Sequence, residues 1–280
     1  MHYLDFLARL HAAARPPTYL EIGVRHGDSL ALARCPAVGI DPSYKLRTEL
    51  GEQVTLFRET SDEYFDRGRP RKPFAGRRIA LAFIDGMHLA EFVVRDFANV
   101  ERHAHWTTAV VFDDVLPRTA DEAARDRRTR LWTGDVYKAL EVLAAHRPDL
   151  LCLRVDTQPT GLGIVLGLDP ASTVLRDRYD EIVRDVVVPD PQDVPERILR
   201  REGALDPQRV LDSSIWRRLG EARAQGTGRR RGMYRVRRSV RRELGVSSPA
   251  PLPGPAAWRR WLRGAGAAAP SARGAARASR

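Results

Sequence analysis

Short apolar runs alternate with segments of helical period along the first two thirds of the chain. Amphipathic segments at 29–34, 44–50, 61–67, 89–102 and 135–146 predict helices between the apolar runs. Continuous apolar strands that alternate with helices are typical of a parallel sheet covered on both faces. The predicted strands are the apolar runs at 18–24, 37–41, 54–59, 79–85, 108–113, 150–155 and 161–168.

The last two predicted strands break this alternation. Only Thr157-Gln158-Pro159-Thr160 lies between the run that ends at Asp156 and the run that begins at Gly161. A parallel crossover needs a dozen or more residues, so these two strands must form an antiparallel hairpin. The pattern therefore predicts an α/β fold with a seven-stranded, mostly parallel sheet, a terminal antiparallel hairpin and helices on both faces.

The C-terminal third changes in character. Helical patterns at 171–187, 195–201 and 207–224 predict an extension that covers the sheet edge or supports a homodimer contact. From residue 225 the chain becomes rich in Ala, Gly, Arg and Ser, a composition that buries too little surface to offset chain entropy. We expect one domain over 1–224, with its core motifs in 18–169 and the helical extension in 170–224. A basic, largely disordered tail is expected over 225–280, with a short helix near 258–262.

The net charge of +11 is concentrated in that tail. Residues 221–280 hold 15 arginines and two glutamates, so the rest of the chain is nearly neutral. Because the core is nearly neutral, it offers no basic surface for nucleic acid. Contact with RNA or an acidic membrane is expected only for the tail.

The two cysteines, Cys35 and Cys152, form neither a disulfide framework nor a zinc pattern. No apolar run approaches the roughly 20 residues that span a bilayer, and the start of the chain predicts an amphipathic helix, so we expect a cytoplasmic protein.

A glycine turn follows the first predicted strand. Gly23 and Gly27 lie in Glu-Ile-Gly-Val-Arg-His-Gly-Asp-Ser, and Asp41 ends the second strand. Such a turn brings backbone N–H groups of a helix start close to a ligand, and the carboxylate can accept hydrogen bonds from ribose. The dinucleotide fingerprint has a middle glycine that this turn lacks, which disfavours a pyrophosphate ligand.

Four motifs in order resemble the class I S-adenosylmethionine-dependent methyltransferases. They are the glycine turn, Gly39-Ile40-Asp41-Pro42, Phe83-Ile84-Asp85-Gly86-Met87-His88 and Val111-Phe112-Asp113-Asp114. The Asp-Gly-x-His element resembles a branch that includes sugar and other small-molecule O-methyltransferases, and the resemblance covers about residues 18–169. It implies a Rossmann-like methyltransferase fold and S-adenosylmethionine as cofactor. It further implies that Glu21, Gly23 and Gly27 line the methionine and ribose end, that Asp41 holds the ribose, and that Ser61 and Asp62 flank the adenine.

Three carboxylates end two strands that should be neighbours. Asp85 ends the fourth strand, and Asp113 and Asp114 end the fifth, so their side chains should converge above the crevice. Converging carboxylates need a cation or protons between them, and hard oxygen ligands suit Mg²⁺. In the resembled enzymes such carboxylates hold a divalent ion, which makes Asp85, Asp113 and Asp114 the expected metal ligands.

His88 follows Asp85 closely and has two interpretations. It could serve as a general base, alone or beside a metal, or it could cap the helix that begins near residue 89. Asp85 and His88 are the expected catalytic residues.

The long segment from 116 to 133 is rich in arginine and leaves the fifth strand above the expected site. It could be a substrate lid in which Trp132 and several arginines contact an anionic acceptor, or a solvated loop anchored by Trp132.

In the helix at 89–102 we expect Phe92 in the core, and Glu91 and Asp96 in solvent or in packing contacts.

These observations predict an enzyme that transfers a methyl group from S-adenosylmethionine to an oxygen of a small molecule, such as a sugar or secondary metabolite, with Mg²⁺ as a candidate aid. One alternative is a nucleic-acid methyltransferase that uses the basic tail, although the Asn/Asp-Pro-Pro-Tyr/Phe signature is absent. An NAD(P)-dependent oxidoreductase and a non-catalytic module that kept the fold are further alternatives.

Overall fold

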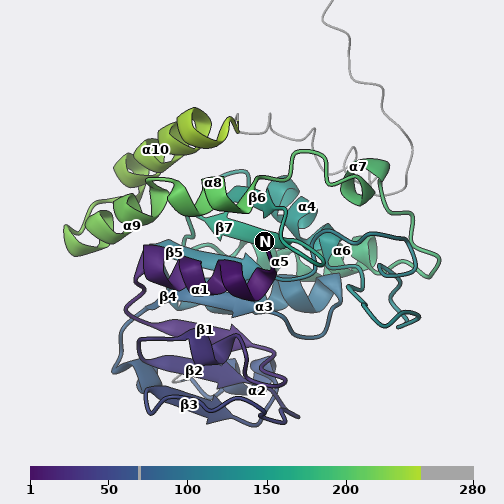
Figure 1. Ribbon diagram of the computed structural model, residues 1–280, viewed down its shortest axis with the longest axis horizontal. Helices are drawn as coiled ribbons and strands as arrows, with labels where there is room; N and C mark the ends of the chain where they lie inside the picture. Colours follow the sequence, from purple (N-terminus) through teal and green to yellow (C-terminus); the bar gives the residue numbers. More distant parts are fainter. Residues whose placement is uncertain (69–70, 247–280) are drawn as a thin grey trace, which may run out of the picture.

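A seven-stranded sheet runs through the centre of the molecule (Figure 1). The computed structural model describes residues 1–68 and 71–246. The strand order is β3-β2-β1-β4-β5-β7-β6; β7 is antiparallel to both β5 and β6, and the other pairs are parallel. The strands are β1 Tyr19–Ile22, β2 Ala37–Ile40, β3 Val54–Phe57, β4 Ile79–Ile84, β5 Ala104–Phe112, β6 Leu151–Val155 and β7 Leu162–Leu166. The predicted fold, including the terminal hairpin, is confirmed.

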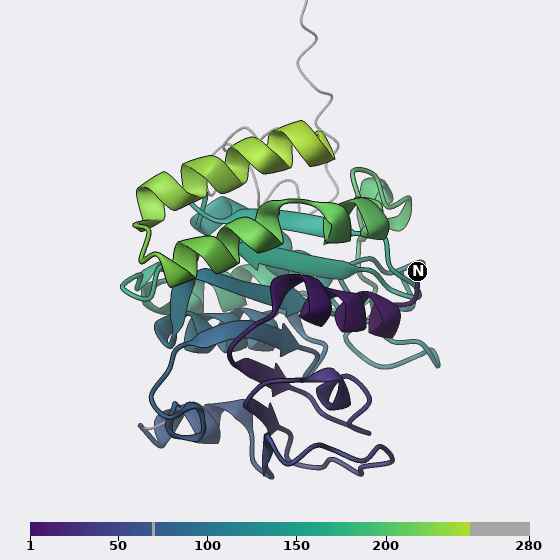
Figure 2. The same ribbon diagram turned by 60° about the vertical axis from the view of Figure 1, so that its left-hand side comes forward.

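Helices cover both faces of the sheet, because side chains along each strand alternate between two apolar layers. Along β4, Ala82 and Ile84 belong to one buried cluster and Leu81 and Phe83 to the other. The first face carries α2 Ser61–Asp66, α3 Ala90–Arg102, α4 Tyr137–His146, α5 Val174–Asp177, α6 Tyr179–Val186, α7 Glu196–Leu199 and the 3₁₀ turn Lys72–Phe74. The second face carries α1 Tyr3–Ala14, the 3₁₀ turn Leu30–Leu32, α8 Pro207–Asp212, α9 Ile215–Ala224, α10 Arg229–Ser239 and the π-helical turn Val240–Leu244 (Figure 2).

Two predicted helices near the glycine turn are wrong. Only the 3₁₀ turn Leu30–Leu32 forms within 29–34, and Ala33 after it already has extended backbone. No helix forms at 44–50, where the backbone pairs with the turn instead. The Lys45 N–H donates to the Arg25 carbonyl at 2.8 Å, and the Arg47 N–H donates to the His26 carbonyl at 3.0 Å. The expected helix start behind the glycine turn is therefore absent.

The C-terminal extension is more ordered than its composition suggests. The helices expected at 171–187 and 207–224 are each split in two, and 229–244 form α10 and the π-helical turn, so a disordered tail from residue 225 is wrong for this segment. Gly232 is the reason that α10 packs closely: a Cβ there would lie 1.9 Å from the Trp106 ring. The rest of the expected tail, including the helix near 258–262, lies outside the described residues. Within the described part of the chain, no helix is both long and apolar enough to cross a membrane.

Candidate active site

A cavity of about 840 Å³ opens at the carboxyl ends of β1, β2, β4 and β5. Open α/β sheets bind ligands at this edge, where the connections diverge. Of the predicted site residues, the cavity wall includes Gly23, Asp41, Ser61, Asp62, Asp85, His88, Asp113 and Asp114. Glu21 and Gly27 are not part of the wall, and their place at the methionine and ribose end stays a prediction.

Gly23 brings the ends of two strands together. Its φ of +89° is unfavourable for other residues, and a Cβ would lie 1.9 Å from the Asp85 carbonyl oxygen. The glycine therefore sets the position of the loop that carries Asp85. Because no α-helix begins behind the turn, the site lacks the helix N-terminus that would cradle a pyrophosphate.

Asp41 fixes the conformation of the same turn. Its Oδ2 accepts hydrogen bonds from the Val24 N–H at 3.0 Å and the Arg25 N–H at 2.8 Å, and its Oδ1 accepts from the Ser43 N–H at 2.6 Å. A carboxylate has about four acceptor positions, so capacity is left for a ligand hydroxyl. Asp41 lies where a ribose-binding carboxylate is expected, and it also orders the backbone around it.

Glu21 is fully buried beneath the turn. Burial raises the pKa of its carboxyl group to about 8, although hydrogen bonds from Tyr19 and Ser29 oppose the shift. The Tyr19 hydroxyl donates to Oε2 at 2.6 Å, and the Ser29 hydroxyl donates to Oε1 at 2.7 Å. Glu21 supports the turn from below, which explains its absence from the cavity wall.

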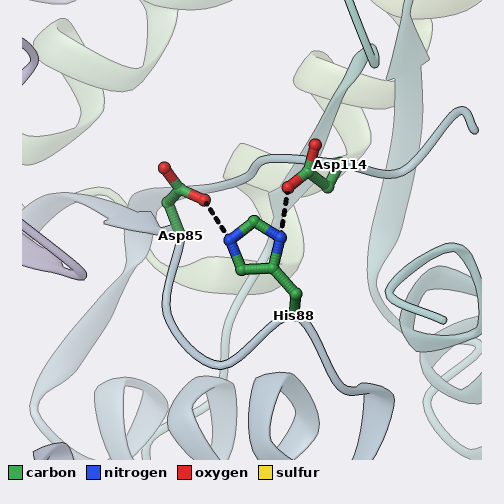
Figure 3. A group of neighbouring side chains, drawn as sticks. All are labelled: Asp85, His88 and Asp114. Atoms are coloured by element: carbon green, nitrogen blue, oxygen red, sulfur yellow. Dashed lines mark ion pairs between the residues drawn. The ribbon is translucent and has the colours of Figure 1, made fainter. Parts of the chain in front are cut away.

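His88 lies between two carboxylates (Figure 3). Its Nδ1 is 2.7 Å from Asp114 Oδ2 and 2.9 Å from the Trp132 carbonyl oxygen, and its Nε2 is 3.4 Å from Asp85 Oδ1. Both neighbours of Nδ1 are acceptors, so this nitrogen carries a proton in either charge state of the ring. Nε2 is left to exchange a proton with Asp85 or with a ligand in the cavity.

The two carboxylates and the imidazole shift one another's proton affinity. Burial lowers the pKa of His88, but the hydrogen bond to Asp114 and the charges of both carboxylates outweigh it and raise the value to about 9. Burial raises the pKa of Asp85 to about 7, against the opposing charge of His88. Near neutral pH the ring therefore favours the imidazolium, and Asp85 holds its proton to a higher pH than an ordinary aspartate.

The segment after β5 forms the wall opposite the glycine turn. Trp132 stacks on the His88 ring with centroids 5.1 Å apart, and its indole N–H donates to the Ala124 carbonyl at 2.6 Å. Gly134 permits this approach, because a Cβ there would lie 1.7 Å from the His88 carbonyl oxygen. Arg127 and Arg130 from this segment also line the cavity, which supports the substrate-lid interpretation over a solvated loop.

The structure groups a different metal-donor set from the expected one. Donor atoms of Asp85, His88 and Asp114 lie within 4.8 Å of one another, whereas Asp113 is outside this group and its Oδ1 accepts from the Asp114 N–H. Two carboxylates and an imidazole could hold a divalent cation, but a set that contains imidazole is less selective for Mg²⁺ than three carboxylates. A bound cation would also replace the contacts that His88 makes to both carboxylates.

The predicted adenine side is built by α2 and α3. The Ser61 hydroxyl donates to Asp96 Oδ1 at 2.5 Å, and Asp62 pairs with Arg95 at 2.6 Å. Of the two expectations for Asp96, solvent or a packing contact, the structure has the packing contact: Asp96 is 3% exposed, and burial raises the pKa of its carboxyl group to about 7. Phe92 is half-buried and lines the cavity, so its assignment to the core is also wrong.

Sequence reasoning missed the N-terminal contribution to the site. His2 and Tyr3, at the start of α1, line the cavity together with Thr160. They reach it because the Tyr3 N–H donates to the Gln158 carbonyl at 2.9 Å, which ties the chain start to the β6–β7 turn. A contact across such a sequence distance leaves no local pattern that could reveal it.

Comparisons with known proteins give one family match and a set of similar solved structures. Residues 20–115 match a family model described as "Methyltransferase domain". No curated protein matches the chain. Similar solved structures include an O-methyltransferase from Bacillus cereus in complex with SAH, with 16% identity, a TM-score of 0.46, and coverage of 59% of this chain and 80% of that one. Another is the O-methyltransferase TomG from Streptomyces achromogenes, involved in tomaymycin synthesis and in complex with SAM, with 17% identity, a TM-score of 0.44, and coverage of 60% and 80%.

The matched region runs from β1 to the first residues after β5 and contains all four motifs that carry the resemblance. The match supports that resemblance for this part of the chain: residues 20–115 are similar to the family described as "Methyltransferase domain".

Proposed function

We propose that the protein transfers the methyl group of S-adenosylmethionine to a hydroxyl oxygen of a small molecule, such as a sugar or secondary metabolite. The observation that carries the proposal is the cavity in which the glycine turn and Asp41 face the Asp85–His88–Asp114 group. When bound, S-adenosylmethionine supplies a methyl group activated by its sulfonium charge. The chain must then align the acceptor and remove one proton.

Asp85 is the proposed base. With a pKa of about 7, it can accept the acceptor's hydroxyl proton at neutral pH. His88, held by Asp114 and Trp132, supplies positive charge beside the developing alkoxide. A divalent cation held by Asp85, His88 and Asp114 could supply the same charge and lower the hydroxyl pKa.

The acceptor in this proposal is a small molecule with an acidic group. Arg127 and Arg130 line the cavity beside Trp132, which fits an anionic, partly planar ligand. The neutral matched domain gives no comparable support for methylation of a nucleic acid. Cytoplasmic localisation and homodimer formation stay predictions.

The proposal is tested by methyl transfer from labelled S-adenosylmethionine to a panel of sugars, sugar phosphates and phenols. Wild-type protein should turn over at least one acceptor, and Asp85→Asn should lower kcat about 100-fold or more. Asp180→Asn, an exposed aspartate on α6, is the matched control and should keep full activity. Absence of turnover with every acceptor, or equal turnover by Asp85→Asn, would contradict the proposal.

A further inference from the structure

A second hollow lies between α9 and α10, the two helices that run side by side at one edge of the molecule (Figures 1 and 2). Its volume is about 450 Å³. We call this hollow the arginine groove. It is lined by Arg218, Arg231, Tyr234, Arg235, Arg238, Ser239 and Arg242. It shares no residue with the wall of the active-site cavity.

Four of the arginines form one stripe. Arg231, Arg235, Arg238 and Arg242 follow one another at steps of four, three and four residues, which places them on one helix face. At 1.5 Å per residue the stripe extends about 16 Å. In the described part of the chain, Arg231, Arg235 and Arg238 have no carboxylate within ion-pair distance, and Arg242 pairs only with Glu243 at 3.2 Å. Like charges concentrated in this way destabilise the fold unless an anion approaches.

The opposite side of α10 anchors the stripe firmly. Arg229 donates to the Gly167 carbonyl at 2.8 Å and pairs with Asp149 at 2.5 Å. Glu243 accepts hydrogen bonds from the hydroxyls of Ser213 and Ser214 at 2.8 Å and 2.7 Å. These contacts hold α10 and the π-helical turn in place without using Arg231, Arg235 or Arg238, so the positions of these three arginines are preorganised for a ligand.

Tyr234 adds an aromatic surface to the charged wall. It is 69% exposed and lies three residues after Arg231 and four before Arg238, on the same side of the helix. It is the only exposed large apolar side chain among the described residues of α9 and α10. A helix that inserts into a membrane surface presents several such side chains, so the arginine groove does not fit that partner.

We propose that the arginine groove binds single-stranded nucleic acid. Guanidinium groups match phosphates in geometry and charge, and an exposed tyrosine between them can stack on an unpaired base. Because the groove and the active-site cavity have separate walls, the bound strand would hold the protein in place and would not be the methyl acceptor. This inference is independent of the proposed methyl transfer.

The experiment measures fluorescence anisotropy of a labelled 12-nucleotide oligouridylate with the full-length chain. Wild-type protein should bind, and Arg235→Glu/Arg238→Glu should weaken binding at least tenfold near physiological salt. Removing two phosphate contacts should also lower the salt slope by about 1.4. Tyr234→Ala should weaken binding several-fold with the salt slope unchanged, because it removes stacking alone.

The matched control is Arg176→Glu/Arg184→Glu, which reverses two exposed arginines on α5 and α6 and should bind like wild type. The arginine-rich residues 247–280 are present in every variant, so a groove variant that binds as well as wild type would overturn the proposal. Binding to vesicles of phosphatidylcholine and phosphatidylserine that depends on the groove, without oligonucleotide binding, would also overturn it. A single-stranded DNA of equal length and a duplex RNA show whether the sugar or the single strand is recognised.

Discussion

At the scale of single residues, the site depends on how protons are shared among buried groups. His88 is fixed by Asp114 and Trp132, while its other nitrogen faces Asp85 across 3.4 Å. The spacing of Asp85 and His88 in the sequence predicted both as catalytic residues, but it could not predict their order of proton affinity. That order follows from burial and from the approach of Asp114, which tertiary packing brings to the ring.

The pH dependence of methyl transfer should be bell-shaped. Activity should fall as pH drops below about 7, since Asp85 then holds a proton and cannot act as a base. It should fall again above about 9, since the imidazolium of His88 is lost. The two apparent values belong to the interacting group as a whole. The measurement is kcat/KM against pH for wild type and His88→Gln; a rise that continues through both values would contradict this assignment.

Glu21 should make stability depend on pH. Its folded pKa of about 8 lies above the ordinary 4.5, so the folded state keeps a proton that the unfolded chain releases. The stabilisation is complete below about pH 4.5 and is lost as pH rises towards 8. Glu21→Gln keeps a neutral side chain at every pH. In this variant the free energy of unfolding should fall with rising pH by about 1.4 kcal/mol per pH unit less than in wild type. Urea unfolding between about pH 5 and 8 measures both slopes, and parallel slopes would show that Glu21 is ionised in the fold.

At the scale of elements, a buried ionic network holds the segment that carries Trp132. Arg125 contacts Glu91 at 2.5 Å and Asp135 at 2.8 Å, and Asp135 also pairs with Lys138 at 2.9 Å. Asp135 Oδ1 accepts from the Ala90 N–H at 2.8 Å and so caps α3. One network thereby joins α3, α4 and the wall of the cavity.

Arg125→Met should destabilise the protein by roughly 3 to 5 kcal/mol, because it leaves buried carboxylates without their partner. The loss should extend to function, since Trp132 would no longer hold the His88 ring. Thermal unfolding measures the stability, and hydrogen exchange over 116–134 measures the order of the segment. Arg128→Met, an exposed arginine three residues on, should change neither; equal effects of the two variants would contradict the network's role.

The elements also show where sequence patterns are sufficient. The strands and their hairpin follow from apolar runs and the length of one connection, both of which are local. The helix expected at 44–50 failed because hydrogen bonds to Arg25 and His26 overrode its pattern. For Glu91 and Asp96 the pattern left solvent and packing contacts open, and partners on other elements, Arg125 and Ser61, hold both side chains inside the fold.

At the scale of the whole molecule, the concentrated positive charge and the proposed active site lie in different places. The active-site cavity gathers carboxylates at the carboxyl edge of the sheet, whereas the arginine groove lies on α9 and α10. Composition located the basic charge near the C-terminus but did not predict α10 there. The fit of Gly232 against Trp106 orders α10, and that fit is invisible without the fold.

Removal of metal tests whether the His88 imidazolium or a bound metal ion balances the negative charge of Asp85 and Asp114. If the imidazolium balances it, methyl transfer should continue after dialysis against EDTA, and added Mg²⁺ should change the rate less than twofold. The control is His88→Gln, in which added cation should restore part of the lost activity. Complete loss on chelation with recovery on Mg²⁺ addition would assign the charge to a bound metal instead.

The most direct test of the central claim is calorimetric titration of the protein with S-adenosylhomocysteine. Wild-type protein should bind one equivalent with a Kd of about 1 to 100 µM. Asp41→Ala should weaken this binding at least tenfold, whereas Asp180→Ala, the exposed control on α6, should leave it unchanged. NADH should give no heat of binding, because the turn lacks a pyrophosphate cradle. Binding of NADH without binding of S-adenosylhomocysteine, or no binding of either, would contradict the account.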